Sequence, residues 1–351
     1  MWVLGLMSGT SLDGVDAALI ATDGVTVLDY GPGFVKPLPT PLRSRITAAL
    51  GSKESTPTIQ QLEYDVTLFH AEVVKELEEL SGITPELIGF HGQTLYHNPP
   101  FTWAIGDGPL LAKLTNCPVV YKLRQNDVDA GGQGAPLAPI YHQALLHQEE
   151  QPLAVLNIGG VANITYLDKN TLIAFDVGPG GALIDTWTQQ HLGVPFDAQG
   201  QWAAQGHCHQ DKVQKWLQHP YFAQNYPKSL DREAFSHVRQ DLAKLAPVDG
   251  AATLMAFTVT GVRLGLARCP QLPRTLWLTG GGRHNSYLVE LLQQELSCTV
   301  RIIDEKGING DLLEAQAFAF LAARSIKQLP LSFPLTTGVP HPMSGGSYAG
   351  I

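Results

Sequence analysis

The sequence predicts an α/β protein of two domains with similar cores that face each other across a cleft. Its 351 residues exceed what one ordinary compact core holds. A meander of three short apolar strands, followed by mixed helices and strands, occurs once in each half of the chain. Apolar strands in both halves end at glycine-rich turns. The repeat lies in the order of the elements, because the two halves share little residue identity.

The strands of the N-terminal half are predicted from short apolar runs and from the turn residues that bound them. A long helix is expected after the meander, because apolar residues recur every three or four positions. Thr56 is suited to cap this helix and Gly82 to end it. The helix stripe consists of Ile59, Leu62, Val66, Phe69, Val73, Leu77 and Leu80. The expected strands are 2–7, 16–21, 25–30, which can extend to 35, and 87–90.

The C-terminal half repeats this order, and its elements are expected at 153–158, 161–167, 172–175 and 275–279 for strands, and from 182 and over 311–326 for helices. We expect an N-terminal domain over 1–132, completed by the tail 335–351, and a C-terminal domain over 133–334. The link AGGQGAPLAP at 130–139 is interpreted as a hinge or crossing point, or simply as a turn-rich loop.

Composition excludes several classes of function. Hydrophobic residues make up 44% and charged residues 16%, as in globular proteins. The net charge of -9, with no basic run, argues against a nucleic-acid partner or an anionic membrane. The four cysteines lack CxxC spacing, so we expect reduced thiols rather than a zinc site or a disulfide framework. The N-terminus is not expected to be a signal peptide, because it lacks a basic region before its short apolar run.

The first glycine-rich turn is GLMSGTSLDGVD, which joins the first two predicted strands. Small residues allow backbone amides to approach an anion, and hydroxyl groups add donors. Asp13 and Asp16 could hold Mg²⁺ through water. The motif is not a Walker A loop. The alternative interpretation is a tight β-turn with Asp13 and Gly14 at its tip.

The second turn, FDVGPGGALID, places Asp176 at the end of a buried strand and before a helix. A carboxylate there is suited to accept a proton from water or a hydroxyl group. A helix-capping aspartate is an equally good interpretation, and Asp185 is expected to be structural or a secondary metal contact. The third turn, LTGGGRHN, contains Gly280, Gly281 and Gly282, which would let the backbone lie against a nucleotide base or ribose. A flexible loop is the alternative there.

These motifs together resemble one known family. The stretches GLMSGTSLDGVDAAL, GFHGQT, DVDAGGQGAPLAP, NIGGVANIT, FDVGPGGALIDTW and LTGGGRHN are similar, in the same order, to those of the anhydro-N-acetylmuramic acid kinases. The resemblance covers nearly the whole chain. It implies two RNase H-like domains of the actin-like ATPase fold.

The resemblance also implies an activity. The substrates would be 1,6-anhydro-N-acetylmuramic acid and ATP with Mg²⁺, the product N-acetylmuramic acid 6-phosphate, and the role peptidoglycan recycling by a cytoplasmic homodimer. It implies that Asp176 is catalytic and that Arg124 and Glu314 contact the sugar. From its position next to Gly92 and Gln93, His91 is interpreted as a further substrate contact or, equally well, as a structural residue. The implied ATP-binding loop is Gly9, Thr10, Ser11, Leu12, Asp13, Gly14, Val15 and Asp16.

Other interpretations remain open at this stage. A kinase for another sugar, a nucleotide-switched ATPase or a glycosidase that uses Asp176 would have the same turns. His207 and His209 flank Cys208, but i, i+2 ligands without a second pair predict a polar loop rather than a metal site. Trp187 and Phe257 are expected in the core.

Overall fold

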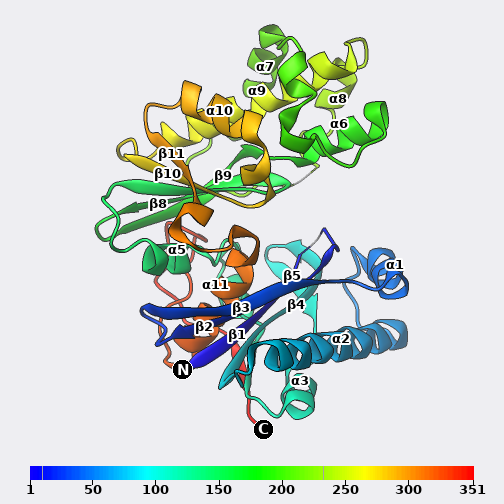
Figure 1. Cartoon of the computed structure of the whole chain (residues 1–351), viewed down its shortest axis with the longest axis vertical. Coiled ribbons are helices and arrows are strands. Elements are labelled where there is room, and N and C mark those ends of the chain that lie inside the picture. Colours follow the sequence, from blue (N-terminus) through cyan, green and yellow to red (C-terminus); the bar gives the residue numbers. More distant parts are fainter. Residues whose placement is uncertain (10, 232) are drawn as a thin grey trace. The chain divides into compact units, whose positions relative to one another are not determined.

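The computed structural model describes residues 1–9, 11–231 and 233–351. The chain forms two compact units, of which unit 1 comprises residues 1–147 and 312–351 and unit 2 comprises residues 148–311. Both units are mixed α/β, as the sequence predicts (Figure 1). In the described part of the chain no helix has the length and apolar character needed to cross a bilayer.

Unit 1 is built on a sheet with the strand order β12-β6-β4-β1-β2-β3, with β5 paired to β4. β1, β2 and β3 form the expected antiparallel meander, and β4 runs parallel to β1. The strands are β1 Trp2–Ser8, β2 Gly14–Thr22, β3 Val27–Pro37, β4 Leu87–Asn98, β5 Phe101–Ile105, β6 Val119–Tyr121 and β12 Ser347–Ala349. The helices are α1 Thr40–Ala49, α2 Pro57–Ser81, α3 Gly108–Thr115, α4 Gln125–Asp129, α5 Pro139–Leu145 and α11 Leu313–Ile326.

The long helix of unit 1 confirms the predicted stripe and its ends. Thr56 accepts a hydrogen bond from the amide of Ile59, and Gly82 ends α2 in the left-handed conformation. All members of the stripe are buried except Leu80, which is 68% exposed. The helix α1 was not predicted, because its ten residues carry only three buried apolar side chains.

Helix α11 packs on the sheet of unit 1 through an unusually close backbone approach. It contacts β1, β2 and β4. A Cβ atom at Gly5 would lie 1.7 Å from the carbonyl oxygen of Ala315, and one at Gly89 would lie 2.2 Å from that of Phe318. These two glycines therefore allow the helix to rest directly on the strands, while Leu4 and Leu6 point into the core that contains α2.

Unit 2 repeats the topology on a smaller scale. Its sheet has the order β11-β10-β7-β8-β9, in which β7, β8 and β9 form an antiparallel meander and β10 runs parallel to β7. The strands are β7 Leu153–Ile158, β8 Val161–Asp168, β9 Thr171–Pro179, β10 Thr275–Thr279 and β11 Thr299–Ile302. The helices are α6 Ala182–Leu192, α7 Gln210–Leu217, α8 Val238–Asp241, α9 Pro247–Leu266 and α10 Ser286–Glu295.

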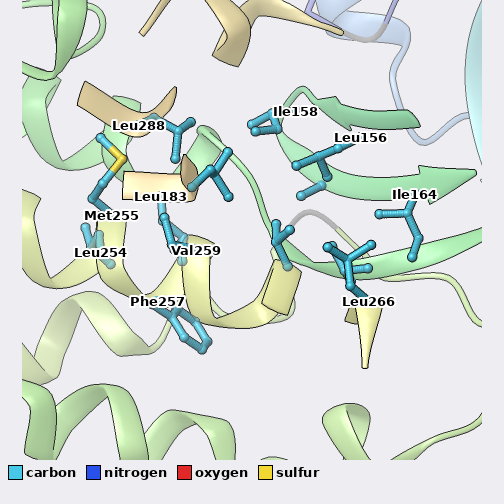
Figure 2. Close-up of a cluster of buried hydrophobic side chains, with 14 of the residues drawn as sticks. Leu156, Ile158, Ile164, Leu183, Leu254, Met255, Phe257, Val259, Leu266 and Leu288 are labelled. Atoms are coloured by element: carbon cyan, nitrogen blue, oxygen red, sulfur yellow. The ribbon is translucent and has the colours of Figure 1, made fainter. Parts of the chain in front are cut away.

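The core of unit 2 is centred on α9, which packs against β8, β9 and the helices α6, α7 and α10. Figure 2 shows Leu254, Phe257 and Val259 of this helix, which belong to the same hydrophobic cluster as Leu156, Ile158 and Ile164 of the strands. Trp187 and Phe257 are fully buried, as expected. Each unit thus has the sheet order expected of an RNase H-like domain, and the duplication of the fold is confirmed.

The unit boundaries differ from the expected ones. The expected break after residue 132 falls inside unit 1, and residues 312–334 also belong to unit 1 rather than to the C-terminal domain. The 130–139 link belongs to unit 1 because it is hydrogen-bonded to other residues of that unit. The amide of Gly134 donates to Asp127, and the amide of Gln133 donates to the carbonyl of Thr337. The strand β12 pairs with β6, so the tail does complete this unit.

Candidate functional site

The turn between β1 and β2 is held in place by β4. Ser8 donates to the side-chain oxygen of Gln93 over 2.6 Å, and the amide nitrogen of the Gln93 side chain donates to the carbonyl of Gly9 over 3.3 Å. The amide of Leu12 donates to the same carbonyl, and Leu12 has a φ of 60°. Gln93 thus fixes the start of the turn. Of the expected nucleotide loop, Thr10 lies outside the described residues.

The two glycines of this turn differ in what the fold requires of them. A Cβ atom at Gly14 would lie 2.6 Å from the carbonyl oxygen of Lys36 in β3, so the strand pairing itself requires a glycine. A Cβ atom at Gly9 would meet nothing closer than the hydroxyl oxygen of Ser11 at 3.7 Å. No packing contact within the described chain therefore explains Gly9, whereas the sequence interpretation had assigned both glycines to phosphate approach.

The other residues of the loop are placed differently. The side chain of Val15 is fully buried, so only its backbone could reach a ligand. Asp13 is exposed, and the guanidinium of Arg43 lies 3.7 Å from its carboxylate. Asp16 is half-buried on β2 opposite Met7 and Val35. Among the residues that the structure describes, no three His, Cys, Asp or Glu side chains are grouped as metal ligands.

Asp176 lies near the end of β9 in unit 2, with its side chain half-buried. One carboxylate oxygen, Oδ2, accepts a hydrogen bond of 2.7 Å from the amide of Leu230. Burial raises the pKa of Asp176 to about 6, although this hydrogen bond and the charge of Lys228 act in the opposite direction. A carboxylate with this pKa is ionised at neutral pH and is a stronger base than an ordinary aspartate.

Three glycine-rich turns of unit 2 meet at one edge of its sheet. The amides of Gly180 and Gly181 donate to the carbonyls of Gly160 and Gly159. The turn after β10 also packs here, because a Cβ atom at Gly280 would lie 2.4 Å from the side-chain oxygen of Asn157. The turn after Asp176 and the triple-glycine turn therefore share the end of β7 as a common support.

Gly281 is the member of the triple-glycine turn that the fold does not require. A Cβ atom there would meet nothing within 4 Å, whereas one at Gly282 would lie 2.5 Å from Ile158. The turn is fixed by Arg283, which is 5% exposed and donates to Asp304, Asp311 and the carbonyl of Gly280. Burial alone would lower the pKa of Arg283, but the two hydrogen-bonded carboxylates raise it above its usual value.

Sequence reasoning did not single out the β7–β8 turn as a site. Gly159 occupies the position in unit 2 that the β1–β2 turn occupies in unit 1, and a Cβ atom there would meet only the carbonyl oxygen of Val161 at 3.9 Å. The sequence does indicate this site. The glycines of NIGGVANIT follow the first strand of the second meander, as the first glycine-rich turn follows the first strand of the chain.

Arg124 and His91 form a second group in unit 1. The Nδ1 atom of His91 lies 2.8 Å from the carbonyl oxygen of Gly92, so it carries the proton, and Nε2 accepts from the Nε atom of Arg124 over 3.2 Å. Burial, followed by the charge of Arg124, lowers the pKa of His91 to about 3. Both ring nitrogens are therefore engaged, and the imidazole is neutral. Phe318 packs against both residues.

The guanidinium of Arg124 is held on a second side by the glycine-rich loop. Its Nη1 atom donates to the carbonyl of Gly134, whose own amide donates to Asp127. Asp127 is 2% exposed and accepts a hydrogen bond from Thr337. Burial lowers the pKa of Arg124, whereas the charges of Glu314 and Asp127 act in the opposite direction. Glu314, in the first turn of α11, is exposed.

The His207–Cys208–His209 segment is a polar loop, as expected. The Nε2 atom of His209 lies 4.0 Å from a carboxylate oxygen of Asp249, whose other oxygen accepts from the amide of His207. All four cysteines are free.

Comparison with known proteins places the chain in one family. The sequence profile of the anhydro-N-acetylmuramic acid kinases matches residues 1–349. Proteins named anhydro-N-acetylmuramic acid kinase from Paramagnetospirillum magneticum and Rhodospirillum rubrum are each 47% identical, covering 99% of this chain and 99% and 94% of their own lengths.

Among solved structures, component A of the (R)-2-hydroxyglutaryl-CoA dehydratase of Acidaminococcus fermentans aligns with a TM-score of 0.50 at 12% identity, over 92% of this chain and 98% of its own. At that identity the likeness concerns the fold alone. The profile and the full-length relatives show that the chain belongs to the anhydro-N-acetylmuramic acid kinase family and is a kinase.

Proposed function

We propose that the chain uses ATP and Mg²⁺ to open and phosphorylate 1,6-anhydro-N-acetylmuramic acid, giving N-acetylmuramic acid 6-phosphate and ADP. The relatives' names supply the substrate. The observation in the molecule that carries the proposal is Asp176, a half-buried carboxylate of raised pKa beside glycine-rich turns. We further propose a cytoplasmic homodimer that acts in peptidoglycan recycling.

The glycine-rich turns fit a nucleotide. Gly9, Gly159 and Gly281 lack side chains at points where the described chain leaves space for a Cβ atom. Exposed backbone amides on such turns are suited to bind phosphate oxygens. We propose that the 9–16 loop and the Gly159 turn hold the phosphates, and that Gly280, Gly281 and Gly282 lie against the adenosine.

The carboxylates of the loop suit a hard cation. Mg²⁺ prefers oxygen ligands, retains several waters and is commonly shared with substrate phosphates. We propose that Asp13 or Asp16 holds it through water. When bound, Mg²⁺ would neutralise charge on the phosphates.

The chemistry assigned to Asp176 follows from the substrate. In a 1,6-anhydro sugar O6 is bonded to C1, so no hydroxyl proton is available for an ordinary kinase base. We propose that Asp176 takes a proton from water as the water oxygen forms a bond to C1. The C1–O6 bond then breaks, and its electron pair stays on O6, which forms the new bond to the γ-phosphorus while ADP leaves. Hydrolysis and phosphorylation are thereby coupled.

Sugar binding is assigned to the group around Phe318. Some guanidinium N–H groups of Arg124 are not used in its hydrogen bonds to His91 and Gly134. Arginine is suited to bind a carboxylate such as that of the lactyl group of the substrate. We propose that Arg124 and Glu314 contact the sugar. His91 contributes by holding Arg124, because both of its nitrogens are already engaged.

The test is incubation with the anhydrosugar in ¹⁸O-labelled water, with and without ATP, followed by mass spectrometry. We expect one labelled oxygen at C1 and a phosphate at O6, and only when ATP is present. Ring opening without ATP would indicate a glycosidase. ATP turnover that ignores the sugar would indicate a nucleotide-switched ATPase, and phosphorylation of ordinary hexoses in preference to the anhydrosugar would indicate another sugar kinase.

A further inference from the structure

A short segment of unit 2, residues 226–230, lies along the end of β9 and contacts Asp176 through its backbone. The amide of Asp176 donates to the carbonyl of Lys228 over 3.0 Å, and the amide of Leu230 donates to the Asp176 carboxylate over 2.7 Å. The ring of Tyr226 stacks on Phe175, the residue before the carboxylate, with centroids 5.3 Å apart. The segment therefore controls the position of the proposed base.

The side chain of Lys228 fastens this segment to Tyr221. Its ammonium nitrogen donates to the carbonyl of Tyr221 over 3.0 Å and lies 4.2 Å from the centroid of the tyrosine ring. The hydroxyl group of Tyr221 in turn donates to the backbone carbonyl of Asp176 over 2.6 Å. Lys228 and Tyr221 are thus linked to each other and, through the tyrosine hydroxyl group, to the backbone of Asp176.

Lys228 interacts electrostatically with Asp176 and with Arg268. Burial lowers the pKa of Lys228 to about 8, and the charge of Arg268 acts in the same direction, whereas Asp176 acts against it. Among the residues that the structure describes, Lys228 and Tyr221 are the titratable groups recorded as interacting with Asp176, and the pKa of Tyr221 is raised by burial and by the aspartate. A cation near a half-buried carboxylate favours the ionised form that a general base requires.

We propose that Lys228 is a positioning residue for the general base. Its contact with Tyr221 keeps the 226–230 segment in place, so that the Leu230 amide donates to Oδ2 of Asp176 and the remaining oxygen, Oδ1, faces the reacting water. This inference rests on the proposed function, because it assumes that Asp176 is the base. It assigns to the 226–230 segment a role that the glycine-rich motifs do not reveal.

The inference predicts a change in pH dependence rather than a simple loss of activity. Replacement of Lys228 by methionine removes the positive charge near Asp176. It also removes the contact with Tyr221 that keeps the Leu230 amide on the Asp176 carboxylate. Each change favours protonated Asp176. The acid limb of kcat/KM for the anhydrosugar, measured at saturating ATP, should therefore move to higher pH by about one unit, the lower end of the effect of an adjacent opposite charge. Lys228→Arg keeps the charge and should keep the limb near its original position.

Hydrogen exchange provides a readout that does not depend on turnover. The Leu230 amide should exchange more slowly than its exposed neighbours in the unmodified protein, and Lys228→Met should accelerate its exchange about tenfold or more, as expected when a hydrogen bond of about 1.4 kcal/mol is lost. The control is Lys244→Met, which removes an exposed lysine of the same unit. It should change neither the pH profile nor the exchange at Leu230.

Two outcomes would overturn the inference. The inference is overturned if the acid limb of Lys228→Met coincides with that of the unmodified enzyme, or if Leu230 exchange is unchanged. If Lys228→Met does not fold by circular dichroism, Lys228→Gln is measured in its place under the same criteria. Failure of the proposed function is recognised separately, because the unmodified enzyme would then not phosphorylate the anhydrosugar, and failure of the assignment of Asp176 as the base because Asp176→Asn would then retain full phosphorylation.

Discussion

The β1–β2 turn of unit 1 and the β7–β8 turn of unit 2 occupy equivalent positions in two sheets of the same order, yet they are built differently. The first spans residues 9–13 and carries hydroxyl and carboxylate side chains. The second consists of Gly159 and Gly160 alone, and the carboxylate on its side comes from Asp176 on β9. One topology can thus supply charge from the turn itself or from the neighbouring strand.

The largest expected effect comes from the carboxylate of unit 2. Asp176→Asn should reduce turnover of the anhydrosugar by about 10² to 10⁴, the usual contribution of a general base. Nucleotide affinity, measured by calorimetry, should remain, because the turns are unchanged. The matched control is Asp168→Asn, at the opposite end of the same hairpin. Among the hydrogen bonds of the described chain, the Asp168 carboxylate accepts only one, from the side chain of Gln271. Turnover near the original value in Asp176→Asn would contradict the assignment.

The same variant should reveal the energetic cost of the base. The folded-state pKa of about 6 lies above that of an unfolded aspartate, so the folded state binds the proton more tightly, and Asp176 destabilises the fold progressively as the pH rises from about 4 to about 6 and by a constant amount above that range. Asp176→Asn should therefore unfold at higher denaturant concentration than the unmodified protein at pH 8, by about 1–3 kcal/mol. That advantage should disappear by pH 4.

A second test separates glycines that the fold requires from glycines that only a ligand would require. Gly14→Ala should destabilise unit 1 by about 1–3 kcal/mol, because its Cβ atom would overlap the Lys36 carbonyl. Gly9→Ala and Gly159→Ala should leave the melting temperature nearly unchanged and raise KM for ATP about tenfold, equivalent to one lost charge-assisted hydrogen bond. Equal nucleotide affinity in both variants would show that these turns do not bind phosphate.

The smallest effect is expected at His91. Gln places an acceptor near the position of Nε2 and should preserve the contact with Arg124, whereas Asn retains only the donor near Nδ1. His91→Asn should raise KM for the sugar about two- to tenfold with little change in kcat, the range of one hydrogen bond. His91→Gln should restore it. If both substitutions have the same effect, His91 does not act through Arg124.

Much of the fold could be predicted because its strands are short apolar runs that end at glycine-rich turns. The helix α9 was not predicted, since Gly250, Gly261 and Gly265 and several β-branched residues lower its helical propensity. Packing explains them: a Cβ atom at Gly250 would lie 2.3 Å from Trp187, and one at Gly265 would lie 2.2 Å from Val177. Helix α9 is therefore determined by tertiary contacts, which no local sequence pattern indicates.

The candidate site shows the same division. Asp176 could be found from its place after a buried strand and before a glycine turn. Its contact with Leu230 joins residues 54 positions apart, and no motif in the sequence indicates that pairing. The unit boundaries were also misplaced, because the fastening of the 130–139 link depends on the distant residue Thr337.

The discontinuity of unit 1 has a consequence for synthesis of the chain. Residues 148–311 emerge from the ribosome as an uninterrupted segment, whereas α11 and β12, which complete the first sheet, are made last. Until then the bare strand face at Gly5 and Gly89 lacks the helix that covers it. Unit 2 can therefore fold before the last residues of unit 1 have been synthesised. A chain that ends before α11 would leave the strand face at Gly5 and Gly89 accessible to chaperones and proteases.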